Sequence, residues 1–412
     1  MKNSNHSNSD YFCIFAGGGV RGTSYIGVLN VLKALNINIR GFAGSSVGAI
    51  FASLHSIGYN NDEIYDIATS LNYEIFKDFY LPFGKSFGIC KGDNLFNWIK
   101  NTLEKKFYEG SYKENENKPI TFKDLDKDLI IIATDIKTCR FKEFSRYTTP
   151  DVEIAHAIRA SASIPGFFKP VWDDESCLVD GDIIKNLPLW TVSKNTIPDN
   201  CRILEFRLEG SNDLREINNT FDYFNAVIDT STNISTDFII DLYGKKDRFD
   251  FIKINTGQTS IIDFSISKEH KKELIKIGAD TTHEYFTKTL KDKKESFQKT
   301  YLIILTSLEE FQKQINKNHY QEAQLLLGEI SLILASDKDY LNTMIIDALF
   351  SLKQLFIKNL TKSLIFNQWK LSGKNEIIAK IQKIKNHLTQ EINEIEYYCS
   401  SINHLKQPKS IH

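Results

Sequence analysis

Residues 11–48 read YFCIFAGGGVRGTSYIGVLNVLKALNINIRGFAGSSVG, and this stretch decides the fold. It begins with six apolar residues, 11–16, that are typical of a buried strand and stop at three glycines. Apolar residues then recur at helical spacing from Ile26 to Leu35, and a second short strand is predicted at 37–43. Strand, glycine loop, helix and strand in this order indicate a parallel α/β sheet.

The same alternation continues to about residue 290, and the pattern then changes. We predict further helices around 50–57, 93–107, 151–160 and 268–289, and strands at 129–134, 177–179, 203–207 and 251–254. After about residue 295, helical stretches alone follow at 297–316, 320–335, 340–366 and 375–402. The expected organisation is a disordered N-terminus (1–10), an α/β domain (11–295) and an all-α helical bundle (296–412).

Composition excludes several classes of protein. The 412 residues carry a net charge of -1, whereas a nucleic-acid binder needs a clear excess of Lys and Arg. The six cysteines show no metal-ligand spacing, so we expect free thiols, no metal and no cofactor. The N-terminus lacks a signal peptide, and no apolar run reaches the ~18 residues of a spanning helix. We therefore expect a cytoplasmic protein, with secretion by a route without a cleaved signal left open.

The sharpest motif is Gly-x-Ser-x-Gly at residues 44–48, with Ser46 at its centre. In this motif the serine lies on a strained turn between a strand and a helix, and the glycines let the backbone pass without Cβ clashes. The following helix presents amides, including that of Val47, to a developing oxyanion. Because an apolar strand and an apolar helix flank the motif, we interpret Ser46 as a nucleophile, with an ordinary turn as the alternative.

The second motif is the glycine-rich stretch GGGVRG directly after the first strand. It also matches the dinucleotide-binding pattern, but that fold needs an acidic residue about 20 positions later. No Asp or Glu occurs between Tyr11 and Asn61, and no lysine precedes Thr23 as in a P-loop. The alternatives that remain are a loop of amides suited to an oxyanion or phosphate, and a purely structural turn. The loop consists of Gly17, Gly18, Gly19, Val20, Arg21 and Gly22.

A third candidate is Asp180-Gly181, at the end of a short predicted strand. An aspartate there is well placed to face a nucleophile, because the glycine beside it permits close approach. Asp-Gly is also a common turn dipeptide, so this pair alone is a weak signal.

In chain order, the glycine loop, the serine motif and Asp180-Gly181 resemble the motifs of the patatin-like phospholipase family. Residues 160–168, ASASIPGFF, are similar to the family's segment just before its aspartate, and the resemblance extends over about residues 11–290. The chain departs from the family at Asp182, where a second glycine or a small residue is more usual.

This resemblance implies a three-layer α/β/α domain with a mostly parallel central sheet. It also implies a calcium-independent carboxylic ester hydrolase of the phospholipase A or lysophospholipase type. Ser46 and Asp180 would form its catalytic dyad, and the glycine loop its oxyanion hole. The substrate would be a phospholipid or another acyl lipid.

The chemistry of a dyad can be checked without the family. A serine hydroxyl is a poor nucleophile until a base removes its proton. A carboxylate can be that base if desolvation raises its pKa from ~4 towards neutrality and it lies within ~3 Å of the hydroxyl. A histidine base is the alternative. The candidates that follow the acid in the chain are His270, His283, His319, His387 and His404, whereas His156 precedes Asp180.

The helical tail contains a basic stretch that could contact a membrane. Between residues 351 and 390, eight lysines stand against one acid, Glu376, with apolar residues and Trp369 interleaved. This pattern indicates either an interfacial element on anionic lipid or a bundle helix with a solvated basic face. In some bacterial members of the resembled family such a region engages a membrane or a protein activator, so we expect these partners by analogy.

Two further interpretations stay open. A catalytically silent lipid-binding or interaction protein could use the same scaffold, although the intact Ser46, Asp180 and glycine loop count against it. A thioesterase would use the same acyl chemistry, so the sequence does not separate it from a lipase.

Overall fold

The computed structural model describes residues 10–81, 87–114, 116–173, 175–184, 201–210, 248–336, 341–362 and 368–402, with residues 217, 223, 226, 230 and 240. Of the segment predicted to be disordered, residues 1–9 lie outside the described residues. The chain divides into two compact units, one of residues 1–244 and 248–283, the other of residues 245–247 and 284–412. The sequence pattern placed the boundary at 295/296. No Gly or Pro occurs in residues 284–316, so the sequence carries no break signal near the boundary of the units.

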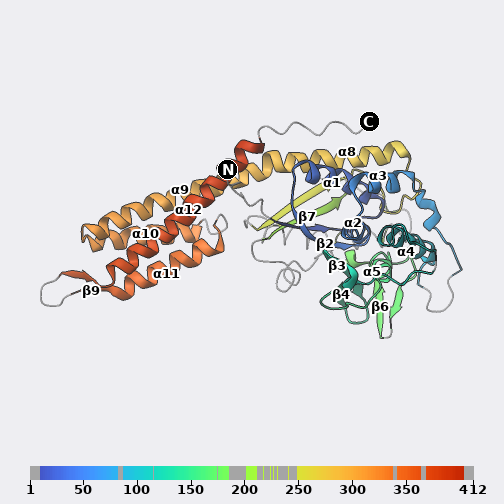
Figure 1. Ribbon diagram of the computed structural model, residues 1–412, viewed down its shortest axis with the longest axis horizontal. Helices are drawn as coiled ribbons and strands as arrows, with labels where there is room; N and C mark the ends of the chain where they lie inside the picture. The colour runs from blue at the N-terminus through green and yellow to red at the C-terminus, as the bar shows by residue number, and fades with distance from the viewer. Residues whose placement is uncertain are drawn as a thin grey trace. The chain divides into compact units, whose positions relative to one another are not determined.

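The first unit is built on an eight-stranded sheet (Figure 1). Its strand order is β5-β6-β3-β2-β1-β7-β8, and β4 pairs with β3. The pairings β1–β2, β2–β3, β1–β7 and β7–β8 are parallel, and those made by β4, β5 and β6 are antiparallel. The strands are β1 (Tyr11–Phe15), β2 (Ile39–Ser45), β3 (Asp128–Asp135), β4 (Arg140–Ser145), β5 (Val171–Asp173), β6 (Ser176–Val179), β7 (Arg202–Glu209) and β8 (Phe249–Asn255).

Helices flank this sheet (Figure 1), which confirms the predicted α/β class. They are α1 (Tyr25–Ala34), α2 (Val47–Ser56), α3 (Asn61–Ser70), α4 (Asp93–Phe107), α5 (Ile154–Ser161) and α8 (Lys268–Glu284). Short 3-10 turns lie at η1 (Gly19–Ser24), η2 (Tyr73–Phe76), η3 (Phe122–Asp124) and η4 (Gly181–Ile184).

The register of the central strands positions the two main motifs. β1 is buried along its whole length and has a parallel neighbour on each side, which explains its uninterrupted apolar sequence. Phe15 pairs with Gly44 across β1 and β2, so the glycine loop and the serine turn leave the sheet side by side at the carboxyl ends of the strands. Ligand sites of parallel α/β sheets lie at this edge.

The second predicted strand runs two residues further than the sequence pattern indicated. The expected span was 37–43, whereas β2 ends at Ser45 and contains Gly41 and Gly44. A Cβ at Gly41 would lie 2.8 Å from the carbonyl oxygen of Asp128 on the neighbouring strand. These glycines permit close packing inside the strand and do not end it.

The second unit contains a helical bundle with a continuous apolar core. Its elements are the π-helical turn η5 (Tyr285–Thr289), α9 (Leu290–Asn316), α10 (Tyr320–Ser336), α11 (Thr343–Asn359), β9 (Leu360–Lys362), β10 (Trp369–Leu371) and α12 (Lys374–Ile402). The helix predicted over 340–366 was too long, because β9, which pairs antiparallel with β10, begins at Leu360 where helix was expected. Among the described residues, no helix combines the length and apolar character needed to cross a bilayer.

The lysine-rich stretch 351–390 spans α11, β9, β10 and the first half of α12, apart from residues 363–367, which are not described. Several of its lysines contact the bundle itself. Lys353 donates to Ser331 Oγ at 2.9 Å, and Lys385 lies 3.5 Å from a carboxylate oxygen of Glu309. A membrane role for this stretch stays a prediction.

Candidate active site

Ser46 occupies the turn between β2 and α2 with a strained backbone. Its φ of 51° and ψ of -126° are rare for a residue with a side chain, and the residue is 4% exposed. A Cβ at Gly44 would lie 2.4 Å from the carbonyl carbon of Gly48, and a Cβ at Gly48 would lie 2.1 Å from the carbonyl oxygen of Phe15. Both flanking glycines are therefore required by close backbone packing, as the motif predicted.

A buried hydroxyl on α5 holds this turn in place. The amide of Ser46 donates to Ser161 Oγ at 2.9 Å, and that hydroxyl donates to the carbonyl oxygen of Ile132 on β3 at 2.5 Å. The sequence pattern of residues 160–168 gave no indication of this role for Ser161. Long-range hydrogen bonds of this kind leave no periodic signal.

The glycine loop runs from the end of β1 into η1, and its amides have different partners. The amide of Val20 donates to the carbonyl of Ile261 (3.0 Å), and that of Arg21 donates to the carbonyl of Gly18 (3.2 Å). Gly19 has a φ of 56°, and a Cβ there would lie 1.8 Å from the oxygen of Ile261, so only glycine fits. Nε of Arg21 donates to the carbonyl of Thr259 at 2.6 Å, an arrangement that braces the loop.

Asp180 follows β6 and is 5% exposed. Its amide donates to the carbonyl of Ser163 (2.9 Å), and its Oδ1 accepts the amide of Asp182 (2.8 Å). A Cβ at Gly181 would lie 2.0 Å from the oxygen of Ile132, which explains why glycine follows the aspartate. The backbone on both sides of Asp180 is therefore held by close contacts, with Ser163 at its amide and with Ile132 at Gly181.

Asp182 links the three motifs. Its Oδ1 accepts the amide of Gly17 at 3.1 Å and the hydroxyl of Ser45 at 3.3 Å. A Cβ at Gly17 would lie 2.8 Å from Cγ of Asp182 and 2.9 Å from Cβ of Ser46, so the loop, the turn and the acidic segment converge. Asp182, the residue that departs from the family pattern, thus accepts a hydrogen bond from the first amide of the glycine loop, that of Gly17.

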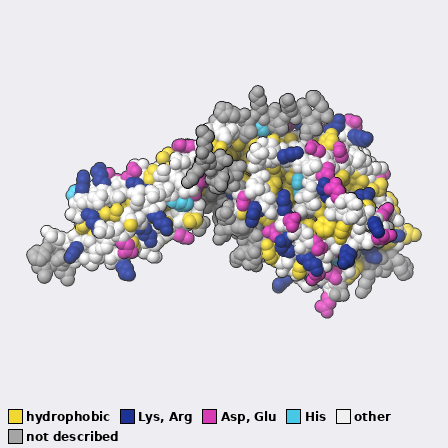
Figure 2. Space-filling view, viewed as in Figure 1, with side chains coloured by type: hydrophobic (Ala, Val, Ile, Leu, Met, Phe, Trp, Pro, Cys, Tyr) yellow, Lys and Arg dark blue, Asp and Glu magenta, His cyan; other side chains and the backbone are white. Residues whose placement is uncertain are grey.

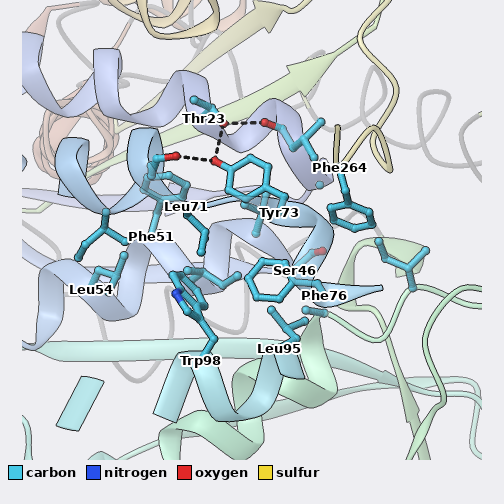
Figure 3. Close-up of a pocket in the computed structure, with 18 of the residues that line it drawn as sticks. Thr23, Ser46, Phe51, Leu54, Leu71, Tyr73, Phe76, Leu95, Trp98 and Phe264 are labelled. Carbon is cyan, nitrogen blue, oxygen red and sulfur yellow. Dashed lines mark hydrogen bonds between the residues drawn. The ribbon is translucent and has the colours of Figure 1, made fainter. Parts of the chain in front are cut away.

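An apolar pocket opens at Ser46 (Figure 3). One wall is the face of α2, where Val47, Ile50, Phe51 and Leu54 follow one another at helical spacing. The other walls come from segments far apart in the sequence. They are lined by Gly19, Val20, Thr23, Ile64, Ile67, Ala68, Leu71, Tyr73, Phe76, Leu95, Trp98, Ala162, Ile164, Phe168 and Phe264.

Two hydroxyls that line this pocket have hydrogen-bond partners within the protein. The hydroxyls of Thr23 and Tyr73 lie 3.1 Å apart, and Thr23 also donates to the carbonyl of Val20 (Figure 3). Burial raises the pKa of Tyr73, so its ring stays neutral. Lys271 donates to the carbonyls of Ala68 and Leu71, and its Nζ lies 4.0 Å from the centre of the Tyr73 ring. These contacts fix the wall formed by α3 and η2.

Arg159 connects this pocket wall with the acidic segment. It is buried on α5 and donates to the carbonyls of Lys91, Gly92 and Lys169 and to the hydroxyl of Ser163, whose carbonyl receives the Asp180 amide. Burial lowers the pKa of Arg159 to about 10, so it remains charged at neutral pH. A lone arginine within a helical pattern gave no sequence signal for this role.

The structure gives other partners to two of the candidate histidines, His270 and His319. His270 Nε2 lies 2.9 Å from Thr259 Oγ1, and His319 lies in the second unit with Gln314 as its partner. His387 is also in the second unit, and His404 lies outside the described residues. Across the described part of the chain, no group of three or more His, Cys, Asp or Glu side chains could hold a metal ion.

The α/β sheet thus presents a strained serine beside a glycine loop and an apolar pocket. A family model described as Patatin-like phospholipase matches residues 14–192. This match confirms the resemblance seen in the motifs. The family match supports lipid hydrolase activity in general.

The similarity to individual proteins is distant. The chain is 28% identical over 298 residues to the uncharacterized protein YqhO of Bacillus subtilis, covering 67% of this chain and 97% of that protein. It is 31% identical over 182 residues to the probable lipid hydrolase 463L of Invertebrate iridescent virus 6, covering 43% and 61%. The solved structure of VipD from Legionella pneumophila matches with a TM-score of 0.46 and 16% identity, covering 98% of this chain and 93% of that one.

Proposed function

We propose that the protein is a lipid acyl hydrolase of the phospholipase A or lysophospholipase type, with Ser46 as nucleophile and Asp180 as general base. The observation that carries this proposal is the apolar pocket that begins at Ser46. From Val47 to Leu54 the α2 wall extends about 10 Å at 1.5 Å per residue, which suits an extended acyl chain. An apolar pocket with few polar groups selects an acyl chain and not a polar substrate.

The proposed reaction proceeds through an acyl-enzyme. Ser46 Oγ attacks the ester carbonyl while Asp180 takes its proton, and the tetrahedral oxyanion collapses with departure of the alcohol, which Asp180 protonates. Asp180 then deprotonates a water molecule that attacks the acyl-enzyme and releases the fatty acid. No metal takes part in these steps, so the proposal includes calcium independence.

The oxyanion would be stabilised by backbone amides of the loop and the turn. The amides of Gly17, Val20 and Arg21 already donate within the protein. We therefore assign the oxyanion contacts to Gly18, Gly19 and Val47, the last at the N-terminus of α2 where the helix dipole also favours negative charge.

The experiment compares ester hydrolysis by the wild-type chain, Ser46→Ala and Asp180→Asn in the presence of EDTA. Each substitution should lower kcat by about 10³-fold or more, because nucleophile and base act as a unit. The matched control is Ser53→Ala, a buried serine of the same helix whose hydroxyl bonds only the Ala49 carbonyl. Activity that survives both site substitutions would reject the dyad.

The same assay separates the alternatives. A silent lipid-binding protein would bind vesicles without hydrolysing any ester. A thioesterase would cleave acyl thioesters faster than the matched oxygen esters of the same chain length.

A further inference from the structure

Five exposed apolar side chains cluster between residues 75 and 89. Leu81 is 94% exposed and Phe79 is 63% exposed. Exposed apolar residues are ordinary when they are scattered singly, whereas a contiguous group marks a contact surface. We call this group the apolar rim, and it consists of Ile75, Phe79, Leu81, Phe87 and Ile89. Residues 82–86 lie outside the described residues and form no part of it.

The rim is carried by two short antiparallel segments joined by backbone hydrogen bonds. The amide of Tyr80 donates to the carbonyl of Ile89 (3.0 Å), and the amide of Lys91 donates to that of Asp78 (3.1 Å). The amide of Ile89 donates in turn to the carbonyl of Phe167 (3.0 Å). The exposed side chains therefore project from a hydrogen-bonded ribbon.

Two charged residues fix this ribbon to the body of the first unit. The Asp78 carboxylate accepts the amides of Gly92 (2.8 Å) and Asn94 (3.0 Å) at the start of α4. Arg159 donates to the carbonyls of Lys91 (2.6 Å) and Gly92 (2.9 Å). Ordering such a surface on binding costs little entropy, because the backbone is already held.

The rim continues into the pocket that begins at Ser46. Phe76 lies next to rim residue Ile75 in η2, and its buried side chain lines the pocket. Phe168 lines the same pocket, and its backbone pairs with Cys90, the neighbour of rim residue Ile89. The ribbon thus has an apolar outer face and adjoins two segments that line the pocket, one at Phe76 and one at Phe168.

The exposed charges near the rim include Lys91, Asp93 and Lys169. Basic and acidic side chains are interspersed over the face of the first unit seen in Figure 2. Near the rim, Glu74 is paired with Lys77 at 2.7 Å, and Asp78 is used by backbone amides. Lys91 and Lys169 are exposed, and neither forms an ion pair with a described residue.

We propose that the apolar rim docks on the surface of an anionic lipid bilayer and passes an acyl chain into the pocket. The inference rests on the proposed function. A lipid surface fits because apolar side chains can enter the headgroup region while Lys91 and Lys169 face anionic headgroups. A lipid surface also explains the continuity with the pocket, since an acyl chain can move from bilayer to pocket without crossing water.

The test measures binding of the full chain to vesicles of phosphatidylcholine with phosphatidylglycerol by sedimentation, using Ser46→Ala so that lipid is not consumed. Phe79→Ser combined with Leu81→Ser should weaken binding by about tenfold or more, since each buried apolar side chain contributes strongly to transfer. The matched control is Phe107→Ser. Phe107 is an exposed phenylalanine at the last residue of α4, about 20 Å along that helix from its first residue, Asp93. This substitution should leave binding unchanged.

Two further measurements complete the test. One distinguishes loss of docking from loss of folding, and the other tests whether binding depends on anionic lipid. With Ser46 restored, the rim variant should hydrolyse a soluble short-chain ester within about twofold of wild type, because the pocket is untouched. Lys91→Glu with Lys169→Glu should weaken binding to anionic vesicles and not to neutral ones.

Wild-type vesicle binding by the rim variant would overturn the docking surface, as would an equal loss of soluble-ester activity. A rim-dependent dimer seen by sedimentation velocity would overturn it as well. A chain that binds vesicles through the rim but hydrolyses no lipid would reject the proposed function and leave the surface standing.

Discussion

The two units bury different kinds of side chain. In the first unit, charged and hydroxyl groups such as Arg159, Asp180 and Glu205 are buried together with the apolar core. In the second, Thr300 is the single buried polar residue among those that the structure describes. Burying a polar group is unfavourable unless it finds partners. The first unit therefore gains defined geometry from its partners, whereas the core of the bundle is built from apolar side chains.

Within the first unit, buried charges are held in different ways. Glu205 and Arg207 on β7 form a buried ion pair with an N–O distance of 2.5 Å. Burial raises the pKa of Glu205, which the neighbouring Arg207 opposes. Arg159, in contrast, makes directed bonds to three carbonyls and a hydroxyl. We expect the hydrogen bonds of Arg159 to contribute most to the stability of the site.

The largest expected effect comes from Arg159→Met. The substitution leaves several buried carbonyls without their donor, so the free energy of unfolding should fall by about 3 kcal/mol or more. Urea unfolding of the full chain measures it, and Arg140→Met, at an exposed arginine, is the matched control with little expected change. If both substitutions lowered the free energy of unfolding equally, the buried hydrogen bonds of Arg159 would not be what stabilises the first unit.

The next largest effect is expected on the pH dependence of the stability of the first unit, through His55. Burial lowers the pKa of His55 to about 4, with a smaller contribution from Lys127, and the ring stacks on Phe42. The unfolded chain takes up a proton below about pH 6.5 while the folded chain stays neutral, so stability should fall from there to about pH 4, by up to about 3 kcal/mol.

His55→Phe should remove this slope while preserving the stacking on Phe42. Thermal melting at pH 5 and pH 7.5 gives the comparison. His319→Gln, at an exposed bundle residue, should keep the wild-type slope. An unchanged slope in His55→Phe would show that other groups cause the acid sensitivity.

A hydroxyl of the first unit should matter for both stability and activity. Ser161→Ala leaves the amide of Ser46 without its acceptor and the carbonyl of Ile132 without its donor. We expect a loss of about 2 kcal/mol in the free energy of unfolding, with lower kcat on a soluble ester because the serine turn loosens. Normal kcat in a destabilised variant would confine Ser161 to a structural role.

Asp182 tests whether charge or hydrogen bonding joins the motifs. Asp182→Gly, towards the family pattern, removes the acceptor for the Gly17 amide and the Ser45 hydroxyl, and should lower kcat/KM about tenfold. Asp182→Asn keeps an oxygen acceptor and should stay within about threefold. If the asparagine variant loses as much as the glycine variant, the negative charge itself is required.

The sequence predicted best what is local. The serine motif, the glycine loop and α4 depend on chemistry within a few residues, and these were found at or near their observed positions. The roles of Asp182 and Arg159 depend on partners far along the chain, such as Gly17 and Lys91, so no periodicity could reveal them.

The same reasoning explains the errors in the bundle. The apolar spacing of α11 continues towards residue 366, and sequence periodicity does not show that β9 leaves the helical path at Leu360. The apolar pocket was not predicted either, because its walls come from α2, α3, α4 and the segments near Phe168 and Phe264. A pocket assembled from distant segments becomes visible only when the fold is known.

The smallest effect is expected for Thr300→Val in the bundle. Oγ1 of Thr300 lies 3.4 Å from the carbonyl of Ser296, a long contact whose loss should cost under about 1 kcal/mol, partly offset by the apolar surroundings of the new methyl group. Urea unfolding monitored beside Ser161→Ala compares removal of one buried hydroxyl in each unit. If the bundle is stabilised by packing alone, the valine chain should also keep full soluble-ester activity. A loss in Thr300→Val as large as in Ser161→Ala would mean that the bundle, too, depends on a directed polar contact.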